Sequence, residues 1–435
     1  MQRIASPPLS RPLQKRFLKL VDSHMRVPHE LASGIAGLPS AGTVFAATQG
    51  AWRFLNSDRV KLPALAVPLR EVGQTRLNDT SAEFGLLVHD WCKFTFQQPA
   101  RKQDLVQLTH ETDVGYELTT ALLVSADDGS PLAPMEMYLK TGQGVLSTRS
   151  PAPPDTPHLE QVLPTMQAAR KWNLSKPLLH VIDREADSVD HYRRWDAEGH
   201  MFLVRADDRR VQWNGNSHLL SEICNTLRSN GEMRHVGKAL YQGRRARLYV
   251  AETAVILDRP AKKNQQGKKF ELPGIPLPLR FIIVQLRDES GQIVLAKWML
   301  LTNMPQELAT AEKLAHCYYW RWRIESFFKL LKSHGHQLEQ WQQKSGPAIA
   351  RRLMIAATAC IVVWQLQADQ SPEANELKTI LVRLSGRQMK YGRPHTAPAL
   401  LAGLWVLLSM LAMLEHYDLN DLKRLANQIP YRDTG

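Results

Sequence analysis

The chain has 435 residues, of which 55 are Lys or Arg and 42 are Asp or Glu, so its formal net charge at pH 7 is +13 and its isoelectric point is near 9.6. This length allows two or three domains. The positive charge favours a polyanionic partner, and nucleic acid is a better candidate than an anionic membrane surface. The cysteines are too few for a disulfide framework and too scattered for a CxxC metal site, which fits a reducing cytoplasm.

Two features of the sequence bear on membranes. The N-terminus MQRIASPPLSRPLQKRF lacks the apolar segment of a secretion signal. The uncharged runs 353–368 and 399–414 are 16 residues each, short of the ~20 that span a bilayer. We therefore predict that both runs are buried helices and that the protein is cytoplasmic, with no membrane partner.

Residues 1–80 are predicted to be helical, with basic side chains throughout and prolines that divide the stretch into short helices. Within it, TQGAWRFLNSDRV, residues 48–60, places Trp52 and Arg53 among amides, a mixture able to contact phosphates and base edges. The segment therefore favours a DNA-binding domain that uses Arg53. A small helical domain with an ordinary basic surface is the alternative.

Apolar runs begin near residue 84 and predict a mixed α/β sheet. FGLLVHD ends its run on Asp90, and two further strands, YELTTALLVSA and PMEMYLKT, form a hairpin. A helix over 158–172 precedes KPLLHVID, a continuous apolar strand that ends on Asp183. A helix over 187–197 and the strand HMFLVRA follow. The predicted order is three strands, helix, strand, helix, strand.

Residues 207–300 alternate between apolar and polar positions, which predicts an antiparallel β subdomain inserted into that plan. Its loops are basic: Arg244 and Arg245 lie in one, and KKNQQGKK is predicted to be a hairpin tip. We expect Arg244 and Arg245 to contact a polyanion, although such loops are often only solvated. Residues 346–435 are predicted to be helical.

The segment YYWRWRIESFFKLLK, residues 318–332, is predicted to be one helix with a polar stripe. At about 100° per residue, Tyr318, Arg321, Glu325 and Lys332 fall within roughly 60° of one another. An adjacent apolar stripe can anchor the helix to a core. Three hydrogen-bond donors, on Tyr318, Arg321 and Lys332, surround the carboxylate of Glu325. This arrangement suits a phosphate-rich ligand beside a carboxylate that binds a metal ion. A solvated helix with charge pairs is the alternative.

Three acids are the best candidates for catalysis. Asp90 and Asp183 at strand ends, with Glu325 on the later helix, give three oxygen ligands for a hard divalent cation. Such a set supports phosphoryl transfer with two metal ions. The sequence contains no GxxxxGK[ST], HExxH or GxSxG motif, which argues against nucleotide-driven, zincin and α/β-hydrolase chemistry.

The same residues resemble the DDE transposases of the insertion-sequence-four group, to which the transposon-five transposase belongs. The group's pattern is Tyr, two residues, Arg, three residues, Glu, six residues, Lys, and Tyr318, Arg321, Glu325 and Lys332 satisfy it. VIDREADS is similar to the second-acid block, and VHD lies where the first acid is expected. GAWRFLNSDRV and KWMLLT are also similar. Trp91 and Cys92 depart from the small hydroxyl residues that commonly follow the first acid.

The resemblance implies a ribonuclease H-like catalytic domain over 81–345, with a β insertion at about 207–300, between a helical end-binding domain at 1–80 and a helical dimerisation domain at 346–435. It implies that Asp90, Asp183 and Glu325 bind Mg²⁺, for which Mn²⁺ can substitute. Tyr318, Arg321 and Lys332 become contacts to the transposon end, and Trp298 becomes the residue that stacks on an extruded base.

The function that we predict is cut-and-paste transposition by a bacterial, nucleoid-associated enzyme. A homodimer in a synaptic complex would cleave double-stranded DNA at terminal inverted repeats through a hairpin and join the 3′-hydroxyls to target DNA. Two alternatives remain open: a metal-dependent nuclease of the same fold, and a transposase-derived DNA-binding protein without turnover.

Overall fold

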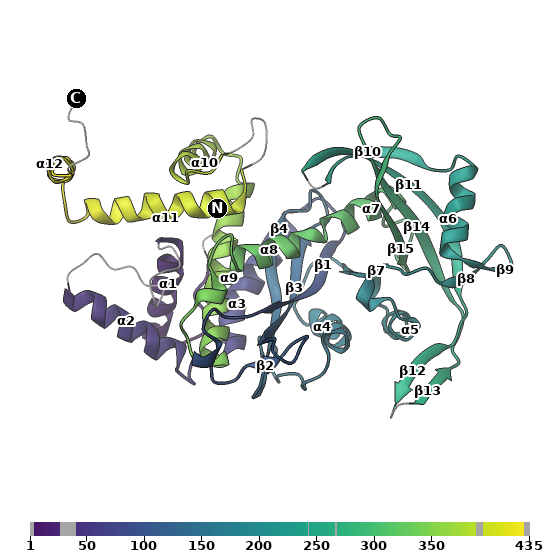
Figure 1. The fold of residues 1–435 in the computed structure, drawn as a ribbon, viewed down its shortest axis with the longest axis horizontal. Helices are drawn as coiled ribbons and strands as arrows, with labels where there is room; N and C mark the ends of the chain where they lie inside the picture. The colour runs from purple at the N-terminus through teal and green to yellow at the C-terminus, as the bar shows by residue number, and fades with distance from the viewer. Residues whose placement is uncertain (1–3, 27–40, 242, 266–267, 389–394, 430–435) are drawn as a thin grey trace.

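The computed structural model describes residues 4–26, 41–241, 243–265, 268–388 and 395–429. One large mixed sheet runs through the molecule, and helices from both ends of the chain gather at one end of it (Figure 1). The helices are α1 Arg11–Arg26, α2 Ala41–Leu55, α3 Leu62–Asn78, α4 Val162–Ala169, α5 Val189–Ala197, α6 Leu220–Ser229, α7 Ala311–Trp320, α8 Trp322–Leu331, α9 Gly346–Ala368, α10 Pro372–Leu384, α11 Ala397–Leu414 and α12 Leu419–Ala426. Short 3₁₀ turns are η1 Pro99–Arg101, η2 His158–Gln161, η3 Arg184–Ala186 and η4 Leu338–Gln340.

The strands of the large sheet follow the order β5-β4-β3-β1-β6-β7-β15-β14-β11-β8-β9, with β2 beside β3 and β10 beside β11. Their bounds are β1 Gly85–Phe94, β2 Val106–Gln107, β3 Val114–Ser125, β4 Pro131–Thr141, β5 Gly144–Ser147, β6 Leu178–Ile182, β7 Met201–Arg205, β8 Arg210–Trp213, β9 Asn216–Leu219, β10 Arg234–Tyr241, β11 Arg244–Leu257, β14 Leu277–Arg287 and β15 Val294–Thr302. A separate hairpin is formed by β12 Ala261–Gln265 and β13 Lys268–Leu272.

The middle of the sheet confirms the predicted mixed α/β plan. β1 pairs antiparallel with β3 and parallel with β6, and β6 pairs parallel with β7. The apolar side chains of residues 86–88 and 179–182 are buried, as expected for strands that are covered on both faces. The helices α4 and α5 lie in the connections to and from β6 and correspond to the two predicted helices.

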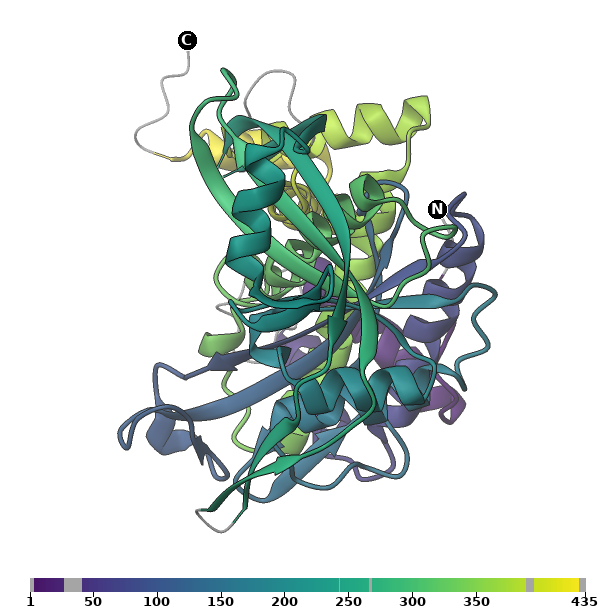
Figure 2. The ribbon, with the colours of Figure 1, turned by 90° about the vertical axis from the view of Figure 1, so that its right-hand side faces the viewer.

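The strands expected over 207–300 are antiparallel, but they do not form a sheet of their own. β15 pairs with β7, so β15, β14, β11, β8 and β9 extend the central sheet. The region also contains α6, which the sequence reading did not predict, and Figure 2 shows this helix lying against the inserted strands. Its apolar side chains Leu220, Ile223, Cys224 and Leu227 pack with residues of β11 and β14. KKNQQGKK is the β12–β13 hairpin, and its tip lies outside the described residues.

Helices from the two ends of the chain pack together around α9. Both α1 and α11 contact α9, and α1 also contacts α11. On α9, Arg351 donates to the backbone carbonyls of Leu55 and Val60, which fixes the junction between α2 and α3. The N-terminal helices therefore share one core with the C-terminal helices, and the boundaries 1–80, 81–345 and 346–435 stay predictions.

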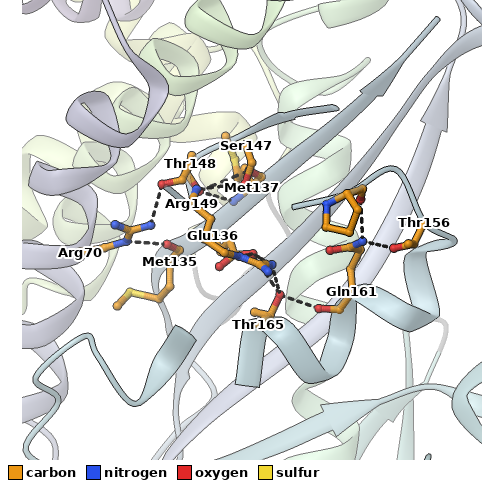
Figure 3. A network of polar contacts seen from close by, with 11 residues as sticks. Arg70, Met135, Glu136, Met137, Ser147, Thr148, Arg149, Thr156, Gln161 and Thr165 are labelled. Atoms are coloured by element: carbon orange, nitrogen blue, oxygen red, sulfur yellow. Dashed lines mark hydrogen bonds and ion pairs between the residues drawn. The ribbon is translucent and has the colours of Figure 1, made fainter. Parts of the chain in front are cut away.

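A buried polar network attaches α3 to the sheet (Figure 3). Arg70 of α3 donates to the carbonyl oxygens of Met135 (3.1 Å) and Thr148 (3.0 Å). Close by, the Glu136 carboxylate of β4 accepts from Arg149 and from the Thr165 hydroxyl of α4. A charged partner and a hydroxyl satisfy Oε1 of the buried Glu136, whereas its Oε2 is buried without a hydrogen-bond partner.

In the described part of the chain, two helices are long and apolar enough to cross a membrane by length and composition, and they differ in burial. In α9 the most apolar window is 89% buried, which confirms the prediction for 353–368. In α11 only 28% of that window is buried, so the prediction of a buried helix over 399–414 is wrong. The fully buried residues of α11 lie within 399–404, Leu407 and Leu408 are half-buried against the core, and Met410, Leu411 and Leu414 remain exposed.

Candidate active site

Asp90 and Asp183 lie beside each other where β6 ends. The parallel ladder of β1 and β6 finishes at the pair Val88 and Val181, and each acid lies two residues beyond that pair. The backbone at Asp183 is still extended, with φ −81° and ψ −171°. Because residues two apart in extended chain project from the same face, both carboxylates point to one side of the sheet.

The prediction that β1 ends at Asp90 is wrong. The strand continues to Phe94 because residues 91–94 pair with residues 116–119 of β3. Asp90 is therefore held by hydrogen bonds to β3, and only its β6 side is open. At this position the Asp90 carboxylate, which is only 14% exposed, lies at the edge of the shorter strand β6.

Glu325 is brought to this edge by α8, which packs on β1. The Arg321 guanidinium bridges the acids: Nη1 lies 2.9 Å from Asp90 Oδ2, and Nη2 lies 2.7 Å from Glu325 Oε1. Its Nε atom is buried with no hydrogen-bond partner. The structure thus joins Asp90, Arg321 and Glu325 directly, with Asp183 beside Asp90.

The helix predicted over 318–332 is in two pieces, α7 and α8, which meet at Arg321. The N–H of Arg321 donates to Tyr318 O (3.1 Å) and the N–H of Ile324 donates to Arg321 O (3.2 Å). Such three-residue hydrogen bonds tighten a turn relative to an α-helix. Lys332 lies just beyond the end of α8, so the single stripe of four polar residues is interrupted.

Tyr318 is buried below the Arg321 guanidinium, which lies 6.0 Å from the centre of the phenol ring. Burial raises the pKa of Tyr318. The Tyr318 ring also contacts Trp298 of β15, with ring centroids 5.4 Å apart, and Trp298 meets Trp322 edge-on at 6.0 Å. Trp298 is 5% exposed. In this structure it is a packing residue beneath Tyr318.

Lys332 reaches β1 and not the acids. Its Nζ donates to Lys93 O (2.5 Å) and lies 3.7 Å from Glu339 Oε1. Three other predicted residues are exposed and away from the carboxylates: Arg53 on α2, and Arg244 and Arg245 at the start of β11. Arg245 makes one long ion pair, 3.9 Å, with Glu289.

Burial and like charge make Asp90 hard to ionise. Desolvation raises its pKa to about 6, against the lowering effect of Arg321 and of a hydrogen bond from the Trp91 N–H, and the charges of Asp183 and Glu325 raise it further. Burial would lower the pKa of Arg321, but Tyr318 and the acids raise it. The cluster therefore holds excess negative charge that a cation would relieve.

Among the described residues, no three Asp, Glu, His or Cys side chains are already arranged as a metal site. The donor set still has suitable chemistry, because three carboxylates offer the oxygen ligands that hard divalent cations prefer. The Arg321 guanidinium lies between Asp90 and Glu325, and we expect it to release at least one of them when a cation binds.

The raised pKa of Asp90 predicts a pH dependence of stability. Between pH about 4 and 6 the folded state holds a proton that the unfolded state has lost, since the pKa is about 6 when folded and 3.8 as the reference. The contribution of Asp90 to the free energy of unfolding should therefore fall as pH rises through this window, by on the order of 3 kcal/mol.

The measurement is urea unfolding of wild type and Asp90→Asn in EDTA from pH 4 to 7. The wild-type free energy of unfolding should fall relative to that of the variant as pH rises, and Mg²⁺ at pH 7 should recover part of the loss. Parallel profiles for the two proteins would contradict the raised pKa.

Two contacts at the site were not predicted from the sequence. The N–H of Glu185 donates to Asp183 Oδ1 (2.9 Å), and Glu339 pairs with Lys332. Glu185 could have been suspected, because a residue two positions after an Asp often donates to its side chain in an Asx turn. No sequence pattern indicated the contact of Glu339 with Lys332.

These features are those of a DDE-type transposase domain, and the comparison with known families agrees. Residues 145–362, half of the chain, match the transposase DDE domain family, and the chain belongs to that family. The matched range contains Asp183 and Glu325, whereas Asp90 precedes it.

Two similar curated proteins are the putative transposase InsL for insertion sequence element IS186A of Escherichia coli strain K12 and the transposase for insertion sequence element IS421 of Escherichia coli. Each is 35% identical over 95 residues, which covers 17% of this chain and 25% of the relative. The chain thus matches about a quarter of the length of these relatives. A solved structure, the cryo-EM structure of the piggyBac transposase synaptic complex with hairpin DNA, aligns with 96% of this chain and 76% of its own, at a TM-score of 0.37 and 11% identity.

Proposed function

We propose that this chain catalyses cut-and-paste transposition: it cleaves DNA at the ends of its own insertion sequence and joins the freed 3′-hydroxyls to target DNA. The observation that carries the proposal is the convergence of Asp90, Asp183 and Glu325 around Arg321 in a chain of the transposase DDE domain family. Likeness to the insertion-sequence-four group through Tyr318, Arg321, Glu325 and Lys332 supports it further.

In this proposal Asp90, Asp183 and Glu325 hold Mg²⁺, or Mn²⁺ in its place. Bound divalent cations supply activation of a water or 3′-hydroxyl and stabilisation of the leaving oxygen. In strand transfer, the 3′-hydroxyl of the element end loses its proton and its oxygen forms a bond to a phosphorus of the target DNA. The bond between that phosphorus and the 3′-oxygen of the target strand breaks. Arg321, once released from a carboxylate, is placed to contact a phosphate.

Two adjoining cavities form a groove between α2 and the region of Lys332, which we assign to the DNA. One cavity is lined by Arg101, Lys102, Arg352 and Glu339, and a second by Trp52 and Asn56; the two share Gln342 and Lys344. Glu339 is the partner of Lys332, whose Nζ donates to β1 near Asp90. Amides and cations in such a groove suit phosphates and base edges.

The remaining predictions are part of the same proposal. The sheet order β4-β3-β1-β6-β7, with β1 antiparallel to β3, supports a ribonuclease H-like core within 81–345. The helices of 1–80 would bind terminal repeats through Arg53, and Arg244 and Arg245 would contact duplex DNA. A homodimer in a synaptic complex, formed through 346–435, and a cytoplasmic, nucleoid-associated location complete it.

The test is a reaction of the purified chain with a duplex that carries the element's end, in Mg²⁺ and with a supercoiled target plasmid. We expect nicks that leave a 3′-hydroxyl at the element boundary, a hairpin intermediate and plasmids with joined ends. Cleavage without joining would favour the nuclease alternative. Specific binding of the end without any cleavage would favour a DNA-binding protein without turnover.

A further inference from the structure

Two stacked rings, those of Trp91 and His158, lie beside the candidate acids and have no part in the chemistry proposed above. Their centroids are 3.9 Å apart and their planes are inclined by 20°. Trp91 directly follows Asp90 on β1, whereas His158 begins η2, which precedes α4. The contact therefore joins the strand of one acid to a distant part of the chain.

His158 is held from both ring nitrogens. Nδ1 lies 3.1 Å from Glu117 Oε1 of β3, and Nε2 lies 3.4 Å from Glu185 Oε2 of η3. Burial would raise the pKa of Glu117, but the hydrogen bond and charge of His158 bring it below the usual value. With Trp91 on its face, the imidazole is fixed on three sides.

Trp91 and Glu185, which both contact His158, also donate hydrogen bonds to the candidate acids. The Trp91 N–H donates to Asp90 Oδ1 at 2.8 Å, and the Glu185 N–H donates to Asp183 Oδ1 at 2.9 Å. Both donor N–H groups therefore belong to residues whose side chains contact His158. The two carboxylates are linked through the imidazole, although they belong to different strands.

We propose that Trp91 and His158 are positioning residues that set the separation and orientation of the Asp90 and Asp183 carboxylates for the cation. The inference rests on the proposed role of these two acids as metal ligands. Metal ligands must be held in place by the groups behind them, and loss of such a group typically lowers metal affinity about 10–100-fold.

The experiment measures Mn²⁺ binding to the full chain without DNA, from the signal of free Mn²⁺ in electron paramagnetic resonance. Trp91→Ala and His158→Ala should each weaken Mn²⁺ binding about 10-fold or more. Trp91→Phe keeps an aromatic face and should bind within about twofold of wild type. Because the His158 side chain is only 21% exposed, thermal unfolding is measured for each variant, and Mn²⁺ binding is compared among those that remain folded.

A double variant and a matched control separate positioning from general damage. Trp91→Ala combined with His158→Ala should bind Mn²⁺ no worse than the weaker single variant, because the residues act as one unit. His218→Ala removes a similar histidine, which faces Trp213 and lies 3.6 Å from Glu222 outside the site, and it should not change Mn²⁺ affinity.

The proposal is overturned if folded Trp91→Ala and His158→Ala bind Mn²⁺ as wild type does, or if their effects add in the double variant. It is also overturned if Trp91→Phe is as weak as Trp91→Ala. Asp183→Asn tests the underlying metal site separately: if this variant binds Mn²⁺ normally, the proposed function fails, whatever the behaviour of His158.

Discussion

Asp183→Asn and Glu325→Gln are each expected to lose DNA cleavage by at least about 100-fold, while binding of the element's end is retained. Both changes keep the shape of the side chain and remove one oxygen ligand and its charge. Because the acids repel phosphate, end binding measured in EDTA should stay the same or tighten. A gel-shift titration and a nicking time course in Mg²⁺ measure the two properties on the same duplex.

Matched controls make the result specific to the site. Asp207→Asn alters an acid that is 62% exposed and pairs with Arg184 at 3.4 Å, and Glu312→Gln alters an exposed acid on α7. Both controls should cleave at the wild-type rate. If Asp183→Asn nicks DNA as fast as Asp207→Asn does, Asp183 is not a metal ligand.

The features of the fold and the site that could be predicted from the sequence depend on residues that are close together in the chain. The apolar run before Asp183 is long enough for one buried strand, and the structure ends β6 at Ile182. The four-residue spacing of Arg321 and Glu325 places them on one helical face, and they form an ion pair. α6 was missed although its signal was present: apolar residues at 220, 223, 224 and 227 follow a helical period, and Glu222 accepts from the Leu219 N–H.

What could not be predicted depends on distant pairing. The extension of β1 past Asp90 is decided by β3, and the joining of the inserted strands to the central sheet is decided by β15 and β7. No Gly or Pro near Arg321 indicates that the helix breaks there. Arg321 also bonds to Asp90, and no local pattern relates those two positions. The contact of Trp91 with His158 is of the same kind.

Trp298 carries the second large expected effect. Trp298→Ala should lower the free energy of unfolding by about 3–5 kcal/mol, since the side chain is 5% exposed and packs against Tyr318 and Trp322. The loss would also loosen Tyr318 beneath Arg321. Trp364→Ala is the matched control, because Trp364 is equally buried and packs against Phe327 of α8. Trp364→Ala should lower the free energy of unfolding by a similar amount without changing the ratio of the rates of hairpin formation and first nicking.

The predicted role of Trp298 in stacking on an extruded base is separated from packing by the milder Trp298→Phe. An intact duplex is too stiff for a 3′-hydroxyl to reach the opposite strand, and extruding a base costs on the order of a few kcal/mol, which stacking on an aromatic face can recover. Because Trp298 is buried, the ring cluster must open for this to happen. We expect folded Trp298→Phe to make the first nick normally and to form the hairpin more slowly, as measured by the ratio of the two rates on denaturing gels. An unchanged ratio, equal to that of Trp364→Phe, would leave Trp298 with a packing role alone.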